Sequence, residues 1–85
     1  MTTWKELLEV QFKYRGDDFS RMVTTLTLEE LNRPFDDGAG GHEGAAFTAW
    51  GERYVYFPAV YGGIEWVESV PRYPCNEATG HVGGE

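Results

Sequence analysis

Apolar and polar positions at the start of the chain follow helical spacing. Thr3 stands three residues before Glu6, the spacing of a capping box, since the hydroxyl can accept a hydrogen bond from the backbone N–H at position 6. Trp4, Leu7 and Leu8 then share one helical face. This pattern predicts a helix of about two turns at the N-terminus.

From Leu8 to Arg15 the pattern changes to strict alternation of apolar and polar residues, which predicts an amphipathic strand. A turn over residues 15–18 would join this strand to a second strand over residues 19–27 in a hairpin. A helix is the competing interpretation of the second segment, because its apolar residues also recur at helical spacing after an Asp18 cap: Phe19, Met22, Val23 and Leu26. The Val- and Thr-rich stretch is poor helix material and favours the strand.

A second capping-box spacing, Thr27 and Glu30, predicts a short helix over residues 28–32, and Pro34 disfavours helical backbone just before it. The segment 36–45 is rich in glycine, buries little apolar surface and costs much conformational entropy to order. We expect a mobile loop that joins two halves of the fold.

The second half of the chain has the pattern of an antiparallel meander. Three strands are predicted, over residues 47–50, 53–61 and 64–70. Gly51-Glu52 suits a type II′ turn between the first two strands, and Gly62-Gly63 suits a type I′ turn between the last two.

Prolines mark the limits of this meander. Pro58 lacks a ladder donor and indicates an edge position or a bulge within its strand. Pro71 and Pro74 end the sheet. Residues 76–85 then form a polar, glycine-rich tail that we expect to be flexible.

Alternation along these strands divides the side chains between two faces, and both faces are apolar enough to need cover. The first face carries one charge, Glu68, among Val55, Phe57, Ala59, Tyr61, Ile64, Trp66 and Val70. The opposite face carries Glu65 and Ser69 among Phe47, Tyr54, Tyr56, Val60 and Val67. We expect Phe57, Tyr61 and Trp66 to lie in the core. For Tyr54 and Tyr56, burial and exposure on a Tyr-rich binding surface both stay open.

These elements predict the fold class. Residues 1–75 form a single small α+β domain, with an antiparallel sheet of about five strands and two short helices. A chain of 85 residues has room for only one such core.

Charge and composition narrow the kinds of partner. Fourteen acidic residues against seven basic ones give a net charge of −7, which disfavours direct nucleic-acid binding and suits docking on a basic protein surface. No apolar stretch approaches the length that spans a bilayer, so we expect no membrane partner. Cys75 is the single cysteine and cannot form an internal disulfide, which suits the cytoplasm.

The residues that carry chemistry do not form a recognised motif. Possible metal ligands gather in the glycine-rich segment without a recognised spacing: Asp36, Asp37, His42 and Glu43. Cys75 and His81 lie in a tail with no scaffold to hold them as nucleophile and base. We therefore expect no catalytic residue, metal or cofactor, and keep a small metal-dependent enzyme only as a minor alternative.

Carboxylates and tyrosines are the candidate partner-binding residues. Paired carboxylates can imitate a row of phosphates, and exposed tyrosines contribute binding energy at interfaces. The candidates are Asp17, Asp18, Glu29, Glu30, Tyr54, Tyr56, Glu65 and Glu68.

The segment YFPAVYGGIEWVESVPRYPCNEATGHVGG, residues 56–84, resembles the C-terminal part of small uncharacterised proteins of bacteriophages and prophages. Small acidic phage proteins of this kind include inhibitors of host defence, anti-CRISPR proteins among them. The resemblance implies a non-enzymatic inhibitor that occupies a basic surface on a host protein or ribonucleoprotein complex, and it assigns no functional residue. The alternative is a self-associating phage protein, in which Tyr54, Tyr56 and Val60 close a homodimer.

Overall fold

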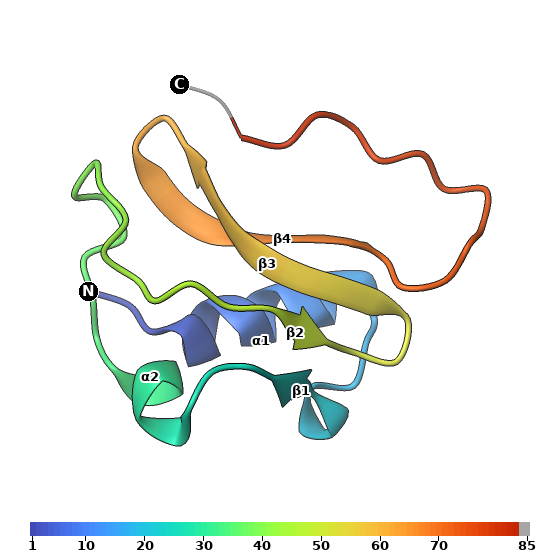
Figure 1. Ribbon diagram of the computed structural model, residues 1–85, viewed down its shortest axis with the longest axis horizontal. Helices are drawn as coiled ribbons and strands as arrows, with labels where there is room; N and C mark the ends of the chain where they lie inside the picture. Colours follow the sequence, from blue (N-terminus) through green and yellow to red (C-terminus); the bar gives the residue numbers. More distant parts are fainter. Residues whose placement is uncertain (84–85) are drawn as a thin grey trace.

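A single long helix lies against one face of an antiparallel sheet in the computed structural model, which describes residues 1–83 (Figure 1). Within these residues the sheet has four strands in the order β1-β2-β3-β4. The elements in chain order are α1 (Trp4–Arg15), the 3₁₀ turn η1 (Phe19–Arg21), β1 (Val23–Thr24), α2 (Leu28–Asn32), β2 (Ala49–Trp50), β3 (Tyr54–Tyr61) and β4 (Ile64–Pro71). The predicted α+β class is confirmed.

The capping box predicted at Thr3 begins helix α1. The Thr3 hydroxyl accepts a hydrogen bond of 3.1 Å from the Glu6 N–H, and the Glu6 carboxylate accepts one of 3.2 Å from the Thr3 N–H. The helix ends at Gly16, whose φ of 71° is the left-handed conformation that glycine adopts without steric cost. Lys13 and Arg15 occupy the last turn, where cations favour the helix dipole.

The strand predicted over residues 8–15 is wrong, because these residues continue helix α1. Leu8 and Phe12 follow Trp4 at intervals of four, and all three are buried, so the helical period decides the conformation. Val10 and Tyr14 made the sequence look like an alternating strand, because they are apolar residues between and after Leu8 and Phe12. They are 67% and 77% exposed on the outside of the helix.

The hairpin predicted across residues 15–18 is therefore absent from the described residues. The segment after the helix is neither a full strand nor a full helix, since η1 occupies Phe19–Arg21 and β1 only Val23–Thr24. Strand β1 pairs with β2 instead, placing Val23 opposite Trp50. A long-range partner thus replaces the local one that the sequence suggested.

The second capping box and the meander are confirmed. Thr27 and Glu30 cap α2, as their spacing predicts. Strands β3 and β4 pair over eight residues each, and Gly62 and Gly63 between them have φ values of 59° and 80°, as a type I′ turn requires. The link between β2 and β3 spans residues 51–53, one residue longer than predicted. Pro58 lies beyond the start of β2, so β3 has a strand on only one side there.

The two faces of the sheet differ in cover. The inner face, which carries Tyr56, Val67, Glu65 and Ser69, packs on α1, and Figure 1 shows α1 passing behind the strands. The core consists of Trp4, Leu8, Phe12, Leu26, Phe35, Phe47, Ala49, Tyr56 and Val67. The prediction that Tyr61 and Trp66 lie in the core is wrong, since they are 57% and 41% exposed, and Phe57 is only half-buried.

The glycine-rich segment has no helix or strand, as predicted, but it is bound to the β3–β4 hairpin. The Glu65 N–H donates to the Asp37 carbonyl at 2.7 Å, and the Gly40 N–H donates to the Gly63 carbonyl at 3.2 Å. The tail also lacks regular structure up to Gly83, and Gly84 and Glu85, which belong to the tail predicted to be flexible, lie outside the described residues.

Candidate functional site

The outer face of the sheet is the surface opposite α1, and apolar side chains cover it. Cross-strand pairs define its members, because residues paired in a sheet point to the same face. The pairs are Val23 with Trp50, Trp50 with Val55, Val55 with Val70, Phe57 with Glu68, Ala59 with Trp66, and Tyr61 with Ile64. Among residues 1–83, Glu68 is the one charged side chain in this set.

Several of these apolar side chains are open to solvent. Val23 is 64% exposed, Tyr61 57%, Ile64 52% and Trp66 41%. The half-buried side chains of Trp50, Val55, Phe57 and Val70 connect these exposed positions across the sheet. Contiguous exposed apolar surface of this kind marks interaction sites.

An aromatic pair stands at the β3–β4 turn end of the outer face. The ring centroids of Tyr61 and Trp66 lie 6.1 Å apart, with the ring planes at 45°. Tyr61 comes from the end of β3 and Trp66 from β4, two residues after the Ile64 that pairs with Tyr61. The pair is therefore held by the hairpin register rather than by a loop.

Glu68 lies in the middle of this apolar surface and is half-buried. It follows Trp66 and precedes Val70 on the same face of β4, and Phe57 lies opposite. Within residues 1–83 its carboxylate forms no hydrogen bond and no ion pair. Glu68 is thus a predicted site residue that the structure places on the exposed apolar surface.

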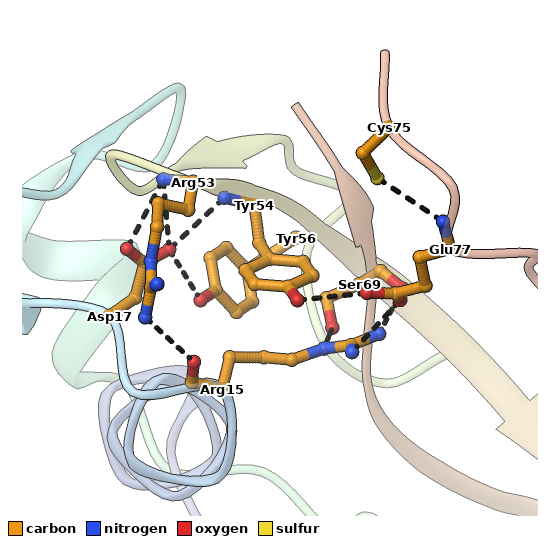
Figure 2. Close-up of polar contacts among 8 residues, drawn as sticks. All are labelled: Arg15, Asp17, Arg53, Tyr54, Tyr56, Ser69, Cys75 and Glu77. Atoms are coloured by element: carbon orange, nitrogen blue, oxygen red, sulfur yellow. Dashed lines mark hydrogen bonds and ion pairs between the residues drawn. The ribbon is translucent and has the colours of Figure 1, made fainter. Parts of the chain in front are cut away.

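Asp17, another predicted site residue, holds two elements of the fold together instead of facing a partner. Its carboxylate accepts hydrogen bonds from the Arg53 N–H at 3.2 Å, the Tyr54 N–H at 3.1 Å and the Tyr56 hydroxyl at 2.9 Å (Figure 2). These bonds join the end of α1 to the start of β3. Burial and the bond to Asp17 raise the pKa of Tyr56 far above its usual range.

Tyr54 and Tyr56 do not form the Tyr-rich binding surface that the sequence left open. Tyr56 is fully buried and its ring stacks on Phe12 with centroids 4.0 Å apart. Tyr54 is half-buried beneath the Arg15 guanidinium, which lies 4.2 Å from the ring centroid. Its hydroxyl donates to Glu77 at 2.9 Å, and this bond raises the pKa of Tyr54.

Arg15 connects α1, β4 and the tail. Its guanidinium donates to the Ser69 hydroxyl at 2.7 Å and the Ser69 carbonyl at 3.1 Å, and it pairs with the Glu77 carboxylate at 3.1 Å (Figure 2). The Arg15 guanidinium therefore contacts the Tyr54 ring and the Glu77 carboxylate at the same time. Through Glu77 it holds the chain after β4 against α1.

Glu65 was predicted as a partner-binding residue, but it is only 3% exposed. Its carboxylate accepts hydrogen bonds from the Glu43 N–H at 2.7 Å and the Gly44 N–H at 3.1 Å. These amides belong to the glycine-rich segment, so Glu65 anchors that segment instead of facing a partner.

The remaining predicted carboxylates lie at η1 and on α2 rather than in the sheet. Asp18 is exposed and caps η1 through the Ser20 N–H and hydroxyl, bonds that lower its pKa. Glu30 completes the α2 capping box by accepting from the Thr27 N–H at 2.9 Å. Glu29 is exposed on α2. The structure does not bring these three to the outer face.

A pocket of about 390 Å³ lies beyond the start of β2, between β3 and the chain of residues 42–46. Pro58, Ala59 and Val60 form one wall, and Glu65 supplies the carboxylate. Both oxygens of that carboxylate already accept main-chain hydrogen bonds. Apart from His42, the other lining residues are small or apolar, and the Glu65 carboxylate is already hydrogen-bonded.

Two further properties concern metals and membranes. In the part of the chain that the structure describes, no three His, Cys, Asp or Glu side chains gather closely enough to hold a metal ion. No described helix combines the length and apolar character needed to cross a bilayer.

Sequence reasoning assigned the outer-face residues to one face correctly but expected them to be covered. The missed residues include Trp50, which joins the surface by pairing with Val55, and Val23, which joins it through the β1–β2 pairing. The one feature of the sequence that could have indicated an exposed face was the charged Glu68 among apolar neighbours on that face.

No protein-family model, curated protein or solved structure matches this chain.

Proposed function

We propose that the protein is a non-enzymatic binding protein that inhibits another protein by covering its surface with the outer face of the sheet. The observation that carries this proposal is the exposed apolar surface around Tyr61, Ile64 and Trp66. A small domain has little apolar area to spare, so aromatic side chains left in water indicate selection for contact with a partner.

The charge of the chain indicates a basic partner. The net charge is −7, and few of the carboxylates are neutralised internally, since the ion pairs among the described residues involve only Arg15 and Arg21 as cations. An acidic protein is steered toward a positively charged surface and away from nucleic acid. Exposed Asp18 and Glu29 remain predicted contributors to that steering.

The partner class follows from this charge and from the resemblance to small phage proteins. We infer a phage-encoded antagonist of a host defence or nucleic-acid-handling complex, acting in the bacterial cytoplasm. Such complexes expose basic surfaces for nucleic acid, and an acidic protein with an apolar centre can cover one of them.

The test is affinity capture from nuclease-treated bacterial lysate with matched variants. Tyr61→Ala combined with Ile64→Ser alters the outer face, and Tyr14→Ala combined with Leu28→Ser removes a tyrosine and a leucine that are each 77% exposed elsewhere. We expect the first variant to lose the captured protein and the second to keep it. Retention by the outer-face variant would overturn the proposal, and so would equal loss from both variants.

Self-association is the second candidate, favoured by the same apolar area. The dimer surface expected from the sequence used Tyr54, Tyr56 and Val60, but these residues belong to the inner face, where Tyr56 is buried. A dimer through the outer face would have to bring two Glu68 carboxylates into one apolar interface, which disfavours it. We therefore place the basic partner first.

A further inference from the structure

We propose that Tyr61, Trp66 and Glu68 form a binding site for the guanidinium group of an arginine on the partner. This inference rests on the proposed function and specifies which chemical group the outer face binds. These three residues are hereafter the Tyr61–Trp66–Glu68 corner.

The corner combines aromatic rings with a carboxylate on one hairpin. The Tyr61 and Trp66 rings are 6.1 Å apart and both are substantially exposed. Glu68 lies two residues beyond Trp66 on the same face of β4, a spacing of about 7 Å along the strand. Trp66 is opposite Ala59, which is buried.

The same combination already holds a guanidinium elsewhere in this protein. Arg15 lies 4.2 Å from the Tyr54 ring centroid and 3.1 Å from a Glu77 oxygen (Figure 2). Planar guanidinium groups stack on aromatic rings and pair with carboxylates at the same time, which a compact ammonium does less well. The Tyr61–Trp66–Glu68 corner has the ring and carboxylate components but no cation among the described residues.

Apart from Arg33, which is exposed at the end of α2, the chain's arginines contact other groups. Arg21 pairs with Asp18 and Glu52, Arg53 donates to the Gly16 carbonyl, and Arg72 donates to the Gly51 carbonyl. Covering the corner with a purely apolar surface would bury the Glu68 carboxylate without a partner, which is unfavourable. A second copy would bring another carboxylate. The complementary partner is therefore a protein segment that presents an arginine beside apolar side chains.

The test is a ¹H–¹⁵N NMR titration with N-acetyl-arginine amide, compared with N-acetyl-citrulline amide, which has similar shape and no charge. Both probes are added to about 50 mM at constant ionic strength, a range that detects weak single-group binding. We expect saturable shifts of the Trp66 indole N–H and the Glu68 amide, with arginine binding about fivefold more tightly than citrulline.

Variants decide whether the carboxylate and the rings are responsible. Glu68→Gln should reduce arginine binding to the citrulline level, whereas Glu9→Gln, at an exposed position on α1, should leave it unchanged. Trp66→Leu should weaken binding of both probes, and the backbone spectrum shows whether each variant is folded. Equal shifts with the two probes, undiminished arginine binding in Glu68→Gln, or no shift at all would overturn this inference. Loss of partner capture by the Tyr61→Ala, Ile64→Ser variant would still support docking, so the two failures are distinguishable.

Discussion

The Tyr56 hydroxyl donates a 2.9 Å hydrogen bond to the Asp17 carboxylate, which joins the buried centre of β3 to the end of α1. The same carboxylate also accepts the Arg53 and Tyr54 amides. An acidic residue that composition alone assigns to a binding surface therefore stabilises the fold.

Replacing Asp17 should cost far more stability than replacing its neighbour. Asp17→Ala leaves the Tyr56 hydroxyl and the Tyr54 amide without their acceptor, and we expect a loss of about 3 kcal/mol in the free energy of unfolding. Asp18→Ala removes only the exposed cap of η1 and should cost about 1 kcal/mol. Urea denaturation followed by circular dichroism measures both values. Equal losses would show that the hydrogen-bonded Asp17 carboxylate has no special role.

The glycine-rich segment should tolerate alanine at one position and not at another. A Cβ at Gly44 would lie 2.5 Å from the Trp4 ring, whereas one at Gly41 would meet only a Glu43 oxygen at 3.6 Å. Trp4 is fully buried and its indole N–H donates to the Ala45 carbonyl at 2.9 Å, so the ring cannot move aside freely. We expect Gly44→Ala to destabilise by about 1–3 kcal/mol.

Thermal unfolding compares Gly44→Ala with Gly41→Ala, which should stay close to the wild type. A wild-type melting temperature for Gly44→Ala would mean that residues 42–46 do not pack on Trp4 in solution.

Stability should fall at alkaline pH because of Tyr56. Its pKa in the folded protein is raised above the ordinary value of 10.0, so the folded state keeps the proton when the unfolded state loses it. This contribution is fully present below pH 10 and is lost progressively above it, by about 1.4 kcal/mol per pH unit for one proton. Tyr56→Phe removes that contribution, along with the hydrogen bond to Asp17.

Denaturant unfolding between pH 8 and 11 provides the measurement. The stability of Tyr56→Phe should be lower at pH 8 and should fall less steeply above pH 10 than that of the wild type. Parallel curves for the two proteins would contradict the buried, hydrogen-bonded position of the hydroxyl.

Local signals predicted most of the element ends correctly. Both capping boxes form, and the Gly62-Gly63 turn sets the register of β3 and β4. Residues 8–15 were misassigned because Leu8 and Phe12 satisfy a period of two as well as an interval of four, and only packing on the sheet resolves the difference.

The candidate site was harder to predict than the helix and strand ends, because it depends more strongly on long-range contacts. Alternation grouped the outer-face residues correctly, but the choice of the covered face depends on where α1 packs. The inner face carries Glu65 and Ser69 and looks less suitable for a core from sequence alone. It becomes suitable because the Gly44 amide and the Arg15 guanidinium, both distant in sequence, satisfy those polar groups.

Glu68 should keep copies of this protein apart. Bringing two outer faces together would remove both Glu68 carboxylates from water without a cation to pair with, in addition to the repulsion between two chains of charge −7. We expect the wild type to be monomeric at about 100 µM and Glu68→Leu to self-associate, because that change makes the whole outer face apolar.

Sedimentation velocity compares Glu68→Leu with Glu29→Leu, which adds the same side chain at an exposed position on α2 and should remain monomeric. Association of both variants alike would indicate general stickiness rather than a specific face. A wild type that is already dimeric, and that becomes monomeric with Tyr61→Ala and Ile64→Ser, would instead favour self-association as the function. Glu68 therefore separates these outcomes. We expect the outer face to bind a basic partner when this carboxylate is present, and a second copy when leucine replaces it.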